Sequence, residues 1–103
     1  MKELEIPLPR NADCLLIGAM IEKVCVSSGL QVALKTTLNK FAGSTHWHFK
    51  NGTDKGTLEI TWWPAQLRAW FSIQGGRNGK WIDQKVVLLQ ESFRTAFSSK
   101  YTL

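Results

Sequence analysis

Apolar residues recur with a period of two between positions 30 and 74, and this alternation constrains the fold more than any other feature of the chain. Turn-forming residues, among them Gly43, Asn51-Gly52 and Pro64, divide the stretch into four runs. Alternation is typical of strands that bury one face, and short connections favour antiparallel neighbours. The runs 30–39, 45–50, 58–63 and 67–74 are therefore predicted to form a four-stranded antiparallel meander.

A helix is predicted after the last of these runs, because the apolar period changes from two to that of a helix. The change follows a glycine-rich break at 75–79, and the helical spacing continues to about Ser99. Six apolar residues define it: Ile82, Val86, Leu89, Phe93, Ala96 and Phe97. Residues 100–103 are predicted to be a frayed tail.

Another helix is predicted before the alternating runs. Asn11 or Asp13 is a suitable N-cap, and Gly29 is a natural stop for a helix that ends at about Val26. The segment is apolar nearly all round, since a single Glu-Lys pair is its only charge after Asp13. Such helices are normally buried on more than one face. The surplus apolar surface is expected to meet the other helix or a second subunit.

The first ten residues contain an alternating pattern of their own. Residues 1–10 are predicted to be a short edge strand or an extended arm, because Pro7 and Pro9 cannot donate to a strand ladder. The element order is then α-β-β-β-β-α, with a fifth strand if residues 1–10 join the sheet. The fold class is predicted as α+β, a two-layer sandwich with both helices on one sheet face, and residues 1–103 as a single domain.

The two cysteines bear on the cellular compartment. Cys14 and Cys25 lie eleven residues apart on one predicted helix, a rise of about 16 Å that no disulfide spans. Free thiols favour a reducing compartment. The first residues lack a signal-peptide pattern, and the apolar stretch 14–21 is too short to cross a bilayer. The chain is therefore predicted to be cytoplasmic and without membrane contact.

The sheet face away from the helices is predicted from strand register. Symmetric closure of the turn at 51–56 places His48 opposite Glu59 and His46 opposite Thr61. A four-residue loop at 63–66 would then place Trp70 beside Glu59 and Arg68 beside Thr61, with Lys35 or Thr37 flanking them. In the simplest interpretation these side chains form ordinary cross-strand contacts.

A second interpretation is a binding face, because outward-facing tryptophans are unusual on a solvated sheet. Aromatic rings surrounded by basic side chains suit a protein partner or single-stranded nucleic acid. A protein partner is slightly favoured. The chain would then be a small non-enzymatic binding module, and a homodimeric structural or regulatory subunit is a further alternative. The predicted binding residues are Trp63, Trp70, His46, His48, Arg68, Lys35 and Lys50.

The third interpretation is a metal site. His46 and His48 are two residues apart on one strand and point the same way, and Glu59 would complete a set of two histidines and a carboxylate. Zinc is the metal that these residue types suggest, and such a set would permit a metal-dependent hydrolase. No organic cofactor is predicted.

Net charge does not decide between these interpretations. The chain has a formal charge of +5, which favours polyanions in general, but its basic residues are scattered along the sequence. The amides at the start of the C-terminal helix, with Arg77 and Lys80 nearby, can attract an anion, as helix N-termini do generally.

Overall fold

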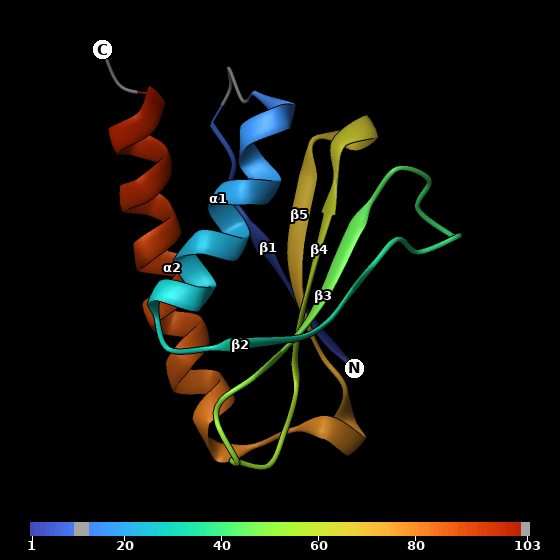
Figure 1. Cartoon of the computed structure of the whole chain (residues 1–103), viewed down its shortest axis with the longest axis vertical. Helices are drawn as coiled ribbons and strands as arrows, with labels where there is room; N and C mark the ends of the chain where they lie inside the picture. Colours follow the sequence, from blue (N-terminus) through green and yellow to red (C-terminus); the bar gives the residue numbers. More distant parts are fainter. Residues whose placement is uncertain (10–12, 102–103) are drawn as a thin grey trace.

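Five antiparallel strands and two helices make up the computed structural model, which describes residues 1–9 and 13–101 and has an α+β fold (Figure 1). The elements are β1 (Lys2–Ile6), α1 (Cys14–Ser27), β2 (Gln31–Thr36), β3 (Thr45–Lys50), β4 (Leu58–Trp63), β5 (Arg68–Ile73) and α2 (Lys80–Tyr101). Two short 3-10 turns, η1 (Pro64–Gln66) and η2 (Gly75–Arg77), flank β5. The alternative N-cap Asn11 and residues 102–103 of the predicted tail lie outside the described residues, whereas residues 100–101 continue α2, so the prediction of a frayed tail is wrong for them.

The sheet has the strand order β1-β5-β4-β3-β2, which confirms the predicted meander and adds a strand to it. β1 pairs antiparallel with β5, with Leu4 opposite Phe71. Residues 2–6 are thus an edge strand and not an arm, and the predicted count of four strands is corrected to five. Pro7 and Pro9 follow β1, so neither proline interrupts the ladder.

Both helices lie side by side on the same side of the sheet (Figure 1). Their apolar residues and the inward-facing residues of β3, β4 and β5 form one buried core that includes Ile17, Ile21, Trp47, Phe49, Ile60, Phe71, Leu89 and Phe93. Gly18 of α1 lies against this layer, because a Cβ there would be 3.2 Å from Cδ1 of Trp62. The missing side chain lets the tryptophan approach the helix closely.

The caps of α1 agree with the sequence prediction. The Asp13 carboxylate accepts a hydrogen bond from the amide of Leu15 at 2.9 Å. At the other end Gly29 has a φ of +94°, the left-handed conformation in which glycine commonly stops helices. Cys25 is buried, whereas Cys14 at the first position of α1 is exposed, and both thiols are free.

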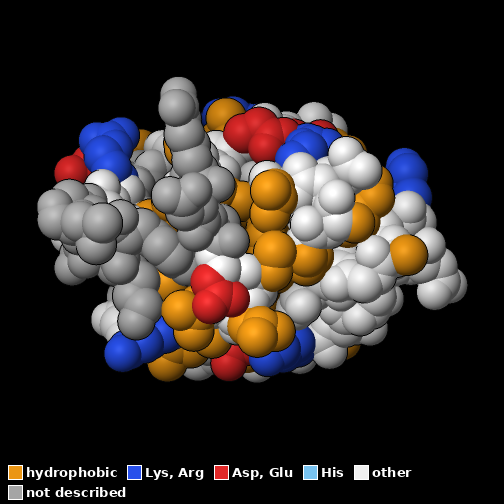
Figure 2. Space-filling view, turned by 90° about the horizontal axis from the view of Figure 1, so that it is seen from above, with side chains coloured by type: hydrophobic (Ala, Val, Ile, Leu, Met, Phe, Trp, Pro, Cys, Tyr) orange, Lys and Arg blue, Asp and Glu red, His pale blue; other side chains and the backbone are white. Residues whose placement is uncertain are grey.

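Apolar side chains also reach the surface. The large exposed ones are Met1, Leu15, Val26, Val32, Leu34, Leu67, Val87 and Leu88. Seen from above in the orientation of Figure 1, hydrophobic side chains gather in the middle of this end of the molecule, with charged groups around them (Figure 2). Within the described chain, neither α1 nor α2 is long and apolar enough to cross a membrane.

β2 departs from the predicted half-buried strand. All six of its residues are exposed, because β2 is an edge strand with a neighbour on one side only. A register shift between Val32 and Leu34 also inserts an unpaired residue, so that Val32 lies opposite Phe49 but Leu34 lies opposite His48. A bulge of this kind reverses the alternation beyond it. Leu34 is therefore on the outer face, and Lys35 is on the helix side.

The turn between β4 and β5 also differs from the prediction. Its loop spans 64–67 and not 63–66, so Trp63 pairs with Arg68. Leu67 adopts a left-handed conformation with φ 49° and ψ 46°, and its amide donates to the carbonyl of Pro64 at 3.1 Å. The register of β5 shifts by two residues as a result. Trp70 lies opposite Thr61, and the predicted pairs Trp70 with Glu59 and Arg68 with Thr61 are wrong.

Candidate metal centre

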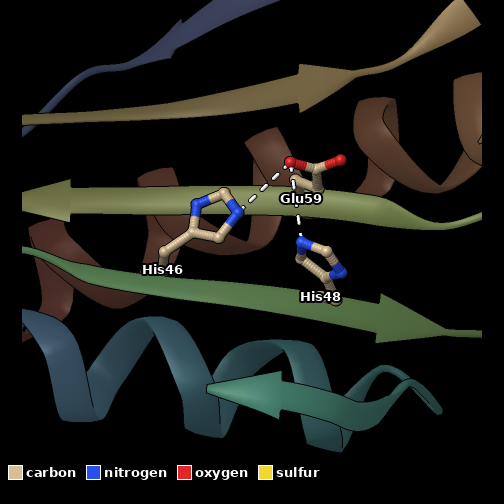
Figure 3. Close-up of side chains that lie close together, drawn as sticks. All are labelled: His46, His48 and Glu59. Atoms are coloured by element: carbon tan, nitrogen blue, oxygen red, sulfur yellow. Dashed lines mark ion pairs between the residues drawn. The ribbon is translucent and has the colours of Figure 1, made fainter. Parts of the chain in front are cut away.

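Three side chains converge on the sheet face that points away from α2 (Figure 3). His46 and His48 come from β3 and Glu59 from β4, and one possible ligand atom of each lies within 4.8 Å of the others. Oε1 of Glu59 is 3.2 Å from Nε2 of His46 and 3.7 Å from Nε2 of His48. The carboxylate thus faces both imidazoles with the same oxygen.

Local sequence explains this convergence. Residues two apart on a strand share a face, so the His-x-His pattern brings both rings to one side. The turn at 51–56 closes β3 on β4 with His48 opposite Glu59 and His46 opposite Thr61, as predicted. The hairpin alone therefore positions the three side chains, independently of β2 and β5.

His46 is held from both sides. Its Nδ1 lies 2.7 Å from Oγ1 of Thr61, and its Nε2 faces Glu59. Burial lowers the pKa of His46 below its ordinary value, an effect larger than the opposing attraction of the Glu59 carboxylate. A neutral imidazole has one N–H and one lone pair. Because the Thr61 hydroxyl can donate or accept, it permits either nitrogen of His46 to carry the proton.

Glu59 is the least satisfied member of the cluster. Its side chain is buried, and Oε2 has no hydrogen-bond donor within the described part of the chain. The closest cation is Arg77 of η2, whose Nη1 lies 3.6 Å from Oε2 and 3.4 Å from Nδ1 of His48. A buried carboxylate oxygen without a hydrogen bond typically costs about 1–3 kcal/mol or more.

The donor set suits a small divalent metal ion. Zinc binds imidazole nitrogen and carboxylate oxygen at about 2.0–2.2 Å in tetrahedral geometry, which separates neighbouring ligand atoms by about 3.4 Å. The two distances from Glu59 to the histidines, 3.2 and 3.7 Å, bracket this value. In that arrangement the Thr61 hydroxyl accepts from Nδ1 of His46 and orients its Nε2 toward the metal, as partners of metal-binding histidines commonly do.

The tryptophans predicted to project into solvent are covered. Trp70 is only 4% exposed, because the ring of Phe41 packs edge-on against it at 5.1 Å and Arg68 lies over it at 4.6 Å. Trp63 contacts Phe41 at 4.9 Å, and its indole donates to the carbonyl of Ala42 at 3.1 Å. The prediction of an open aromatic surface is wrong for Trp70, and Trp63 is half-buried.

The basic residues predicted for this face have other partners. Lys35 pairs with Glu22 of α1 at 2.9 Å on the helix side. Lys50 donates to the carbonyl of Gly56 at 2.7 Å and thereby closes the turn between β3 and β4. Arg68 pairs with Glu5 of β1. The structure thus unites the three predicted metal-binding residues and does not bring the predicted basic residues into one group.

Two residues of the outer face were not predicted as part of a site. Phe41 lies in the loop between β2 and β3, and an aromatic residue in a loop gives no signal of where it packs. Arg77 was recognised only as a basic residue near the start of α2. Gly75 and Gly76 within η2 and Gly79 after it mark an irregular connection, but they do not predict that Arg77 reaches Glu59.

Comparison of the chain with models of protein families, with curated proteins and with solved structures finds no match. The fold and the cluster of two histidines and a buried carboxylate therefore carry the functional argument.

Proposed function

We propose that this chain is a metal-binding protein that holds a divalent ion, zinc in the first instance, with His46, His48 and Glu59. One observation carries the proposal: the buried Glu59 carboxylate faces two imidazoles with one oxygen, while the other oxygen has no hydrogen bond among the described residues and lies 3.6 Å from Arg77. Both helices pack on the opposite sheet face in a two-layer arrangement, which leaves this face for the site.

The alternative of an ordinary hydrogen-bonded cluster explains the arrangement less well. Without a metal ion, Oε1 of Glu59 lies 3.2 Å from Nε2 of His46 and 3.7 Å from Nε2 of His48, and the second distance is too long for a hydrogen bond. The negative charge is buried and its counter-charge, Arg77, is 3.6 Å from the unsatisfied oxygen. Buried charges are normally paired, hydrogen-bonded or bound to metal. A divalent cation between the three ligand atoms balances the charge directly.

Macromolecular binding by the same face has less support. Stacking of a base or a partner side chain requires an accessible ring, and Phe41 covers Trp70. The basic residues that would meet phosphates or acidic side chains are engaged with Glu22, Gly56 and Glu5. Self-association and a cytoplasmic location stay predictions from the sequence.

Metal content and zinc binding test the proposal. After equilibrium dialysis against zinc, we expect about one tightly bound ion per chain and an increase in the unfolding temperature. Glu59→Gln keeps the shape of the side chain and removes the charged ligand, so it should abolish both effects. His48→Ala should do the same, and it affects the more exposed of the two histidines.

Glu22→Gln is the matched control, since Glu22 lies on α1 and pairs with Lys35 on the helix side of the sheet. We expect this variant to bind zinc as the wild type does. The proposal is overturned if the wild type binds no zinc, or if Glu59→Gln binds it with unchanged affinity.

A further inference from the structure

We infer that the metal-loaded centre binds a phosphate group between the metal ion and Arg77. The inference rests on the proposed metal-binding function and adds the chemical class of its ligand. It follows from the charge of the site, from the coordination position that three ligands leave free, and from the place of Arg77.

The site becomes positively charged when a metal binds. Without metal, the Glu59 carboxylate and the Arg77 guanidinium carry opposite charges that cancel. A divalent ion bound by two neutral imidazoles and one carboxylate, together with Arg77, gives the centre a net charge of about +2. His46 and Glu59 are both buried, so solvent screens this charge weakly. A doubly charged anion such as phosphate compensates it.

The free coordination position lies toward solvent on the Arg77 side. A tetrahedral ion with three protein ligands keeps one position for an external ligand. His48 has the most exposed side chain of the three, at 19%, and Arg77 beside it is 53% exposed. An anion therefore reaches the metal past His48 and Arg77, whereas Thr61 occupies the opposite side of His46.

Metal binding also releases Arg77 from its present contact. When Nε2 of His48 binds a metal, its proton lies on Nδ1. Nδ1 then becomes a donor and no longer accepts from Arg77, which lies 3.4 Å away. Glu59, once bound to the metal, is also a weaker partner for the guanidinium. The N–H groups of Arg77 can then donate to another acceptor, and a phosphate group accepts two parallel hydrogen bonds from a guanidinium.

Cobalt substitution gives a direct readout, because tetrahedral cobalt(II) has visible absorption bands that respond to a change of ligand. Cobalt-loaded protein is titrated with inorganic phosphate and, separately, with phenyl phosphate, at constant ionic strength with chloride. We expect saturable spectral changes. A response to both ligands indicates a site for phosphate groups in general, and a response to inorganic phosphate alone indicates a site for the free ion. Either result supports the inference.

Arg77→Gln is the decisive variant. It should retain cobalt binding and weaken phosphate binding at least about tenfold, the loss expected for charge-assisted hydrogen bonds. Arg94→Gln is the control, since Arg94 lies on α2 and pairs with Glu91. Cobalt binding without a spectral response to phosphate, or an unchanged phosphate affinity in Arg77→Gln, overturns this inference alone. Failure to bind cobalt overturns the proposed metal function as well.

Discussion

Gly79 lies directly before α2, and the turn between β3 and β4 passes very close to it. A Cβ atom at Gly79 would lie 1.9 Å from the carbonyl oxygen of Lys55, well inside the closest nonbonded contact. The approach is mutual, because a Cβ at Gly56 would lie 2.8 Å from the amide nitrogen of Gly79. We therefore expect Gly79→Ala to force the turn and the start of α2 apart.

The size of the loss follows from the contacts at this close approach. The indole of Trp81 donates to Lys55 O at 2.8 Å, and the amide of Thr57 donates to Arg77 O at 2.8 Å. Each hydrogen bond contributes about 0.5–1.5 kcal/mol net, and overpacking costs about 1–3 kcal/mol. Gly79 precedes α2, so alanine brings no gain in helix propensity. We expect the free energy of unfolding to fall by about 2–6 kcal/mol.

Urea unfolding followed by tryptophan fluorescence measures this loss. Gly76→Ala is the matched control, because no described atom lies within 4 Å of a Cβ at that position. It should leave the free energy of unfolding unchanged or raise it by up to about 1 kcal/mol. A Gly79→Ala variant within about 0.5 kcal/mol of the wild type would refute the reasoning from the close approach. Equal losses in both variants would refute it too.

Three further expectations concern α1. Glu22→Ala should lower the free energy of unfolding by about 1–3 kcal/mol, because the buried indole of Trp47 donates to Glu22 at 2.9 Å. Lys35→Ala removes only the exposed ion pair with Glu22 and should cost at most about 1 kcal/mol. Urea unfolding of the two variants measures both losses. Hydrogen bonds from Lys35 and Trp47 lower the pKa of Glu22, so the stability that its charge supplies is present above pH 4.5 and is lost as the pH falls through the lowered pKa. The stability difference between wild type and Glu22→Gln should accordingly shrink below pH 4.5. A thiol reagent such as Ellman's should modify Cys14 rapidly and Cys25 only on unfolding, because burial raises the pKa of Cys25 to about 12; two fast thiols would contradict this.

The hairpin of β3 and β4 was predictable because its information is local. Strict alternation assigns each residue to a face, and the turn at 51–56 is centred so that inward residues meet inward residues. These two facts place His48 opposite Glu59 without any knowledge of the rest of the fold. The helices were predictable for the same reason, since caps and apolar spacing lie within each segment.

The bulge in β2 was not predictable from residue types. The unpaired residue lies between Val32 and Leu34, and alternation of apolar residues continues through it in the sequence. The ladder with β3 decides that Leu34 turns outward and that Lys35 meets Glu22. Interstrand pairing is a tertiary contact, and it overrides the local pattern.

The register of β5 depends on the turn at 64–67 in the same way. A leucine in the left-handed region is uncommon, so nothing in the sequence marks Leu67 as a turn residue. Its conformation shifts Trp70 from Glu59 to Thr61. The loop before β3 then brings Phe41 over Trp70, a contact between segments far apart in the chain. Both features follow from packing, which alternation does not encode.

The composition of the outer face is the strongest argument for the proposed metal centre. Its buried polar or charged residues include His46, Glu59, Thr61 and Ser72. If burial were the only requirement on this face, apolar side chains would stabilise the fold equally well. Replacing buried ionic groups by apolar ones of similar volume is often neutral or stabilising by about 1–4 kcal/mol. The inner face of β3 and β4 has that apolar composition. Burial alone therefore explains the inner face, whereas the metal ion that we propose would explain why the outer one has two imidazoles and a carboxylate.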